Sequence, residues 1–144
     1  MSTDGDSNTP QQRIQALISE FSSLPDWESR YRKIIQMGKK LPPIADDLKI
    51  EAHLIHGCQS QVWLTAQREP SGRIHFSGES DALIVNGLLS VLLHVYSNST
   101  PQDILQTPLD FMKTLGFENQ LTPSRANGMY AMIKQMKYYA LALS

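Results

Sequence analysis

The stretch that decides the fold is Ala82-Leu-Ile-Val-Asn-Gly-Leu-Leu-Ser-Val-Leu-Leu-His-Val95, because it is apolar on most sides. A helix that is hydrophobic nearly all round belongs in the middle of a core. Asn86, Ser90 and His94 interrupt the stretch, which is also shorter than the ~20 residues that a membrane-spanning helix needs. We therefore expect a central, buried helix around which the rest of the chain packs.

Upstream of this helix the apolar spacing changes to a period of two. Apolar and polar residues alternate along residues 50–55, which predicts a strand. A second β-prone run begins at Val62-Trp-Leu-Thr65. Glu69-Pro-Ser-Gly-Arg73 then has the residues of a tight turn before a third run, Ile74-His-Phe76. These runs predict a three-stranded antiparallel sheet.

Amphipathic helices are predicted before and after the strands along the chain. Apolar residues between Ile14 and Phe21 recur at helical spacing, and a second helix has Asp26 as its N-cap and Gly38 as its stop. Downstream, Thr-Pro pairs at residues 100–101, 107–108 and 122–123 indicate helix starts, because the hydroxyl caps the first turn. The expected fold class is α+β in the order α-α-β-β-β-α-α-α-α, with helices packed against the sheet.

The chain has 144 residues, 41% hydrophobic and 19% charged, which is typical of one globular domain. Residues 1–11 contain no large apolar residue after Met1, so we predict a tail there and a single domain over residues 12–144. The net charge of −1 argues against nucleic acid or an anionic membrane as partner. The acidic, polar N-terminus is unlike a secretory signal, and we expect a cytoplasmic protein.

The cysteine count excludes several kinds of chemistry. One cysteine excludes an internal disulfide, a CxxC pair and a thiolate-rich zinc or iron–sulfur site. The Gly-rich and Gly-Lys-Ser/Thr nucleotide motifs and HExxH are absent, and the histidines lack the spacing of metal ligands, so no metal site is expected. The histidines are His53, His56, His75 and His94. What remains is the cysteine itself, Cys58.

Cys58 has two interpretations. A free cysteine most often acts as a small buried hydrophobe. Here, however, it lies between Gly57 and Gln59-Ser60-Gln61 at a break between strands, which is typical of a loop tip where a thiol can reach another molecule. With a reference pKa of about 8.5, a thiol is only slightly ionised at pH 7 unless a cation or backbone amides favour the thiolate. His56 and Arg125 are candidates for that role, although each is a common surface residue.

Several motifs occur together along most of the chain. They are Trp27-Glu-Ser-Arg-Tyr31, Gly38 with Leu41-Pro42, Gly57-Cys-Gln-Ser-Gln-Val-Trp63, Ser80-Asp-Ala82 with Ile84-Val85 and Gly87-Leu88, Thr100-Pro-Gln-Asp-Ile104, Leu121-Thr-Pro-Ser-Arg125, and Asn127-Gly128. In this order they resemble the SufE family, sulfur-acceptor partners of cysteine desulfurases in iron–sulfur cluster assembly. The resemblance covers about residues 13–142. Gln59-Ser60 resembles SufE proper more closely than its relative CsdE.

The resemblance implies a fold similar to the IscU scaffold and a mechanism of sulfur transfer. A SufS-like cysteine desulfurase with pyridoxal phosphate would hold sulfur as a persulfide, and Cys58 would take that sulfur and pass it to a SufBCD-like scaffold. The chain would stimulate the desulfurase without being a stand-alone enzyme. It would need no cofactor of its own, because pyridoxal phosphate belongs to the partner. Building a cluster on this chain is excluded because a scaffold needs several ligands.

The resemblance assigns roles to few residues. It makes Cys58 the covalent site, with Gly57, Gln59, Ser60 and Gln61 forming the loop around it. Asp81 and Arg125 would shape the loop or the docking face, or else act as a helix cap and a helix-start salt bridge. Whether Ile55, Trp63 and Leu64 enclose the resting thiol is left open, as is a homodimer. The alternative function is a non-catalytic adaptor, and a cysteine hydrolase is disfavoured because no base with an orienting partner is evident.

Overall fold

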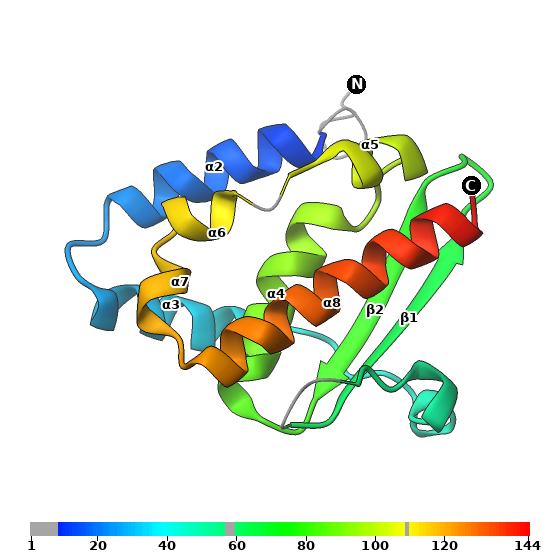
Figure 1. The fold of residues 1–144 in the computed structure, drawn as a ribbon, viewed down its shortest axis with the longest axis horizontal. Helices are drawn as coiled ribbons and strands as arrows, with labels where there is room; N and C mark the ends of the chain where they lie inside the picture. Colours follow the sequence, from blue (N-terminus) through cyan, green and yellow to red (C-terminus); the bar gives the residue numbers. More distant parts are fainter. Residues whose placement is uncertain (1–8, 57–59, 109) are drawn as a thin grey trace.

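The computed structural model describes residues 9–56, 60–108 and 110–144. Its centre is helix α4 (Leu83–Tyr96), which confirms the predicted central helix. Leu88, Leu89 and Val91 in this helix are completely buried. Figure 1 shows the other helices and a β-hairpin arranged around α4.

The hairpin consists of β1 (Val62–Arg68) and β2 (Ile74–Ser80), which run antiparallel with Val62 opposite Ser80 and Arg68 opposite Ile74. Alternate side chains of both strands are buried in the core with α4, as the period of two in a strand requires. The buried members are Val62, Leu64, Ile74 and Phe76. The second and third predicted strands are therefore confirmed, and the structure is a mostly helical α+β fold.

The predicted strand over residues 50–55 is wrong, and the sheet has two strands in the described residues instead of three. Two short 3-10 helices, η1 (Asp46–Leu48) and η2 (Glu51–His53), occupy most of this region. The alternation is misleading because Ile50 is 46% exposed and does not face the core. A local turn satisfies the backbone, with the His53 amide donating to the Ile50 carbonyl (3.0 Å). Only Leu54 reaches the sheet, through a single antiparallel bridge to Trp63.

Helix α2 (Pro10–Ser22) begins inside the segment that the sequence assigns to the tail. Thr9 and Gln12 form a capping box: the Gln12 amide donates to Thr9 Oγ1 (3.2 Å) and the Thr9 amide to Gln12 Oε1 (2.9 Å). Pro10 at the first helical position lacks the amide that would otherwise be unpaired. The helix therefore starts earlier than the apolar pattern indicates. Residues 1–8 lie outside the described residues.

Helix α3 (Trp27–Lys39) is capped by Asp26 as predicted, with the Ser29 amide donating to Asp26 Oδ1 at 2.8 Å. Gly38, however, is not a stop, because it lies inside the helix. A Cβ atom at Gly38 would lie 2.7 Å from the backbone nitrogen of Gly87 in α4. The absence of a side chain thus lets α3 and α4 cross closely, and Asn86 Nδ2 donates to the Gly38 carbonyl (3.1 Å) at that crossing.

The C-terminal part forms α5 (Pro101–Gln106), α6 (Phe111–Thr114), α7 (Phe117–Gln120) and α8 (Pro123–Ala142). Thr100 and Thr122 cap α5 and α8 as predicted, accepting from the amides of Asp103 and Arg125. The predicted helix start at Thr107-Pro108 is wrong. Thr107 is the C-cap of α5, and its hydroxyl donates back to the Asp103 carbonyl (2.6 Å) instead of capping a new helix.

The Trp27–Tyr31 motif has a structural role. The rings of Trp27 and Phe117 meet edge to face at 6.0 Å between centroids, and Arg30 Nη1 donates to the Leu115 carbonyl (3.2 Å). The motif therefore joins α3 to the turn between α6 and α7. Among the described helices, none combines the length and apolar character that crossing a bilayer requires.

Candidate functional site

The segment that carries the cysteine connects His56 to Ser60. Gly57, Cys58 and Gln59 lie outside the described residues, so the roles predicted for them stay predictions. The described residues on either side define where this segment, the cysteine loop (residues 56–61), begins and ends.

The C-terminal end of the cysteine loop is held at Gln61. The Gln61 amide donates to Asp81 Oδ1 (3.1 Å), and the Gln61 carbonyl accepts from the Asp81 amide (3.2 Å) and from Ser80 Oγ (2.9 Å). The alternative role of Asp81 as a helix cap is wrong, because Ala82 is the N-cap of α4 and no side chain caps it. The carboxylate of Asp81 contacts the cysteine loop instead.

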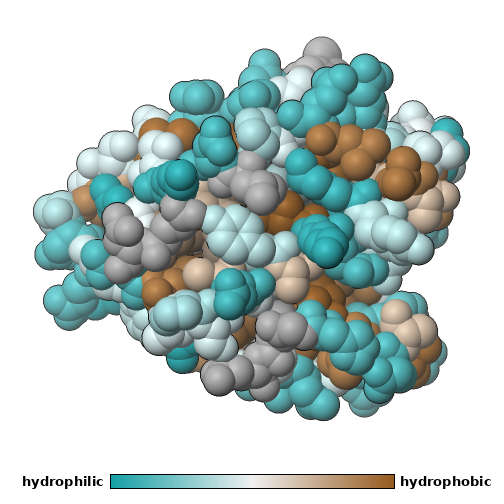
Figure 2. All heavy atoms as spheres, viewed as in Figure 1, coloured by the Kyte–Doolittle hydropathy of each residue, from teal (hydrophilic) through white to brown (hydrophobic). Residues whose placement is uncertain are grey.

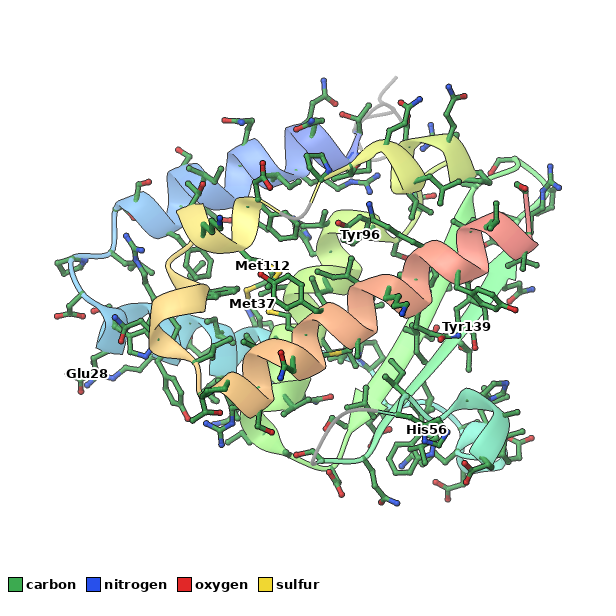
Figure 3. The ribbon with its side chains drawn as sticks, in the orientation of Figure 1. Glu28, Met37, His56, Tyr96, Met112 and Tyr139 are labelled. Carbon is green, nitrogen blue, oxygen red and sulfur yellow. The ribbon has the colours of Figure 1, made fainter. Side chains whose placement is uncertain are left out.

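The N-terminal end is held by the sheet. The Ile55 amide donates to the Val62 carbonyl (2.8 Å), and Ile55 is buried in the core. The His56 side chain, by contrast, is about three-quarters exposed, and its Nε2 atom lies 3.3 Å from Glu51 Oε2. Figure 3 shows His56 beside η2. The two ends of the cysteine loop are thus fixed by neighbouring backbone groups of one sheet.

A small cavity of about 70 Å³ lies beside Ser60. Its walls come from α4 and from the first half of α8, and they combine apolar side chains with one cation. The lining residues are Ser60, Val85, Leu88, Ser124, Arg125, Gly128 and Met132. The structure therefore brings Ser60 and Arg125 together although they are far apart in the sequence. Arg125 has no carboxylate partner among the described residues, so the salt bridge considered for it is not seen there.

The apolar walls of this cavity come from buried residues of α4 and α8. Val85, Leu88 and Met132 belong to helices whose apolar pattern marks them as buried, and nothing in that pattern separates a cavity wall from ordinary core. Trp63 and Leu64, considered as an enclosure for the thiol, do not line this cavity. Leu64 is buried in the core. The Trp63 ring makes a cation–π contact with Lys49, whose Nζ atom lies 5.6 Å from the ring centroid.

A larger hollow of about 550 Å³ lies at the other end of the loop, at His56. It is bounded by the second half of α8 and by α5, and several of its apolar side chains are exposed, with Tyr138 at 64% and Leu141 at 62%. Figure 2 shows a hydrophobic patch in the region of α5 and the C-terminal half of α8. The first half of α8 lines the cavity at Ser60, and the second half lines the hollow at His56. The two described ends of the cysteine loop therefore lie at different hollows.

Among the described residues, no group of three or more histidine, cysteine, aspartate or glutamate side chains gathers in one place. Of the histidines, His53 is engaged locally, with Nδ1 at 2.7 Å from the Leu48 carbonyl oxygen. For His94, burial and then the charge of Arg13 lower the pKa of the ring.

Comparison with known proteins identifies a family and a similar fold. The sequence model of the family described as SufE, an Fe-S metabolism associated domain, matches residues 15–140. The fold is similar to the solution structure of a hypothetical protein from Thermus thermophilus, with a TM-score of 0.77 and 23% identity over 94% of this chain and 96% of that chain. At that identity the similarity establishes the fold. Because the family match spans most of the chain, this protein belongs to the SufE family and has a role in iron–sulfur metabolism.

Proposed function

We propose that the protein accepts sulfur from a cysteine desulfurase onto Cys58 and delivers it to an iron–sulfur scaffold. The family implies interaction with a desulfurase, and the chain has one cysteine to receive the sulfur. The observation that carries the proposal is the cavity beside Ser60, where apolar walls and the Arg125 guanidinium meet next to the cysteine loop.

The transfer is an exchange between sulfur atoms. The Cys58 thiolate attacks the outer sulfur of the persulfide on the desulfurase, and a new S–S bond forms. The bond between the two sulfurs of the donor breaks, and the donor cysteine leaves as a thiolate with that electron pair. Cys58 becomes a persulfide, and no external oxidant or reductant is needed because the outer sulfur moves as a unit. Delivery to the scaffold repeats the exchange with a scaffold thiolate as attacker.

The cavity beside Ser60 suits such a sulfur. Residue 58 is two residues from Ser60, which is a span of at most about 7 Å along the chain. Val85, Leu88 and Met132 can exclude water and soluble thiols from a persulfide. A guanidinium nearby favours the ionised form of a thiol or persulfide, and because Arg125 is exposed this attraction is partly screened by water.

Asp81 supports the proposal by fixing one end of the loop. The Gln61 amide and carbonyl are both bonded to residues 80–81, and the Ile55 amide is bonded to Val62, so the described residues on both sides of the cysteine are held in place. Asp81 thereby acts as a loop-shaping residue.

Intact-mass spectrometry tests the proposal. After incubation with a SufS-like desulfurase, pyridoxal phosphate and cysteine, we expect the protein to gain one sulfur atom and to stimulate the desulfurase. Cys58→Ser removes the only thiol in the chain, so it should abolish both effects while circular dichroism shows an unchanged fold. A serine variant that still gains sulfur or still stimulates fully would contradict the proposal.

The hollow at His56 favours a second candidate, an adaptor that binds the desulfurase without taking sulfur. Its exposed apolar side chains can bury surface against a partner whether or not a thiol is present. Alkylation of Cys58 separates the two functions. The adaptor keeps both binding and stimulation after alkylation, whereas the sulfur acceptor loses stimulation.

A further inference from the structure

The outer edge of β2 is the edge that faces away from β1. Figure 1 shows β1 on one side of β2 and no strand on the other. The hydrogen bonds at the two ends of the hairpin give its register: the Glu69 amide donates to the Arg73 carbonyl, and the Asp81 amide donates to the Gln61 carbonyl. Because bonded pairs alternate in an antiparallel ladder, odd-numbered residues of β2 bond to β1 and even-numbered ones face outward.

In the middle of this outer edge, three backbone groups have no hydrogen-bond partner among the described residues. At one end of β2, the Ile74 amide donates to the Ser99 carbonyl, and the Phe76 amide donates to Ser97 Oγ (3.0 Å). At the other end, the Ser80 amide donates to Asn86 Oδ1 (3.0 Å). Between them, the Phe76 carbonyl and the amide and carbonyl of Gly78 have no hydrogen-bond partner in the described residues. They present an acceptor, a donor and an acceptor in the order that a further strand would require.

Phe76 and Gly78, both buried, line a slot of about 540 Å³, a size within the range of ordinary ligand sites. Its outer wall is the connector from Leu41 to Ala45, which the Ile44 amide fastens to Glu79 Oε1 (3.0 Å). The connector runs past the edge of β2 but contains Pro42 and Pro43, which have no amide hydrogen to donate to it. Its floor is apolar and comes from α3 and α4, with Met37 and Leu93 among the lining residues.

The charge of the slot is positive. Lys40 lines it and pairs with no carboxylate among the described residues, and none of the lining residues is acidic. Two histidines, His75 and His94, also line the slot, and both are exposed; partial desolvation and then the charge of Arg13 lower the pKa of the His94 ring. Glu79, which bonds to the connector at Ile44, is paired with Lys49 at 3.1 Å.

We propose that this slot binds an extended segment of another protein as a third strand beside β2. The segment would accept from the Gly78 amide and donate to the carbonyls of Phe76 and Gly78, as in other cases of strand addition. It would carry apolar residues at alternate positions for the slot floor and a carboxylate for Lys40. This proposal is independent of sulfur transfer.

A designed peptide tests the proposal by NMR spectroscopy. The probe is an acetylated and amidated peptide of alternating valine and threonine with an aspartate at each end. On titration we expect shifts of the Ser77 and Gly78 amide resonances and slower hydrogen exchange at Gly78, which has no acceptor in the free protein. The same peptide with N-methyl groups at alternate residues cannot donate to β2, and we expect its affinity to fall by at least about tenfold.

Two neighbouring lysines supply a matched pair of variants. Lys40→Glu should weaken binding about three- to tenfold, because it replaces attraction by repulsion at an exposed site. Lys39→Glu makes the same charge change in the adjacent residue, which does not line the slot, and should leave the affinity unchanged. The proposal is wrong if millimolar peptide leaves Gly78 unperturbed, if N-methylation has no effect, or if Gly78 protection rises with protein concentration alone, as pairing between copies would require.

Discussion

At the scale of single residues, the structure gives Arg125 and Asp81 different contacts beside one loop. Arg125 lines the apolar cavity at Ser60, and Asp81 bonds to the backbone at Gln61. Asp81 does not cap α4, and Arg125 forms no salt bridge with a carboxylate in the described residues, so neither has the purely structural role considered for it. Each can therefore be tested for an effect on the loop separately from an effect on the fold.

Arg125→Leu should slow alkylation of Cys58 by iodoacetamide about three- to tenfold at pH 7, because the thiolate loses a neighbouring cation. The pH midpoint of the alkylation rate should rise, while Arg125→Lys should retain most of the wild-type rate. Arg32→Leu is the control, since Arg32 lies on the surface of α3 and pairs with Glu28. Equal pH profiles for wild type and Arg125→Leu would show that the guanidinium does not act on the thiol.

Asp81→Ala should speed hydrogen exchange of the Gln61 amide severalfold, because that amide loses its carboxylate acceptor. The free energy of unfolding should change little, since the carboxylate is not a helix cap. Asp26→Ala, which removes a true N-cap from α3, should by contrast lower the free energy of unfolding by about 1 kcal/mol. If the two substitutions destabilise the protein equally while Gln61 exchange stays constant, Asp81 is a structural residue only.

At the scale of elements, prediction from sequence is reliable where the cause is local. The caps at Asp26, Thr100 and Thr122 depend on a side chain and an amide three residues away, and all are predicted correctly. Residues 50–55 are misread because Ile50 has no core to face, which depends on the fold. Thr107 is misread because its hydroxyl donates back to the Asp103 carbonyl, a second local bond that the Thr-Pro pattern does not distinguish from a helix cap.

The close crossing of α3 and α4 predicts that Gly38→Ala lowers the free energy of unfolding, whereas helix propensity alone predicts that it raises it. From helix propensity alone, Gly38→Ala should stabilise α3 by up to about 1 kcal/mol. In the structure the new methyl group would meet the backbone of Gly87, which cannot move aside as a side chain can, so we expect a loss of about 1–3 kcal/mol in the free energy of unfolding. Gln36→Ala on the exposed face of α3 is the control and should change it by less than about 0.5 kcal/mol. A more stable Gly38→Ala protein would mean that the helices do not cross this closely.

At the scale of the whole molecule, the candidate site depends on contacts that no local pattern contains. The cavity joins Ser60 with Arg125 and with core residues of two helices, and only the fold brings these segments together. The resemblance to the SufE family indicated which residues to consider, but not that Val85, Leu88 and Met132 form the apolar wall. The slot beside β2 shares no lining residue with the hollows at either end of the cysteine loop, so a bound strand would leave both of them open.

The most direct test of the central claim is to locate transferred sulfur by peptide mapping. The protein would be incubated with a desulfurase and cysteine labelled with heavy sulfur, trapped by alkylation without reduction, and digested. The account predicts one labelled sulfur atom on the peptide that contains Cys58, as an alkylated persulfide. Label that stays on the desulfurase while its activity is still stimulated would contradict the account.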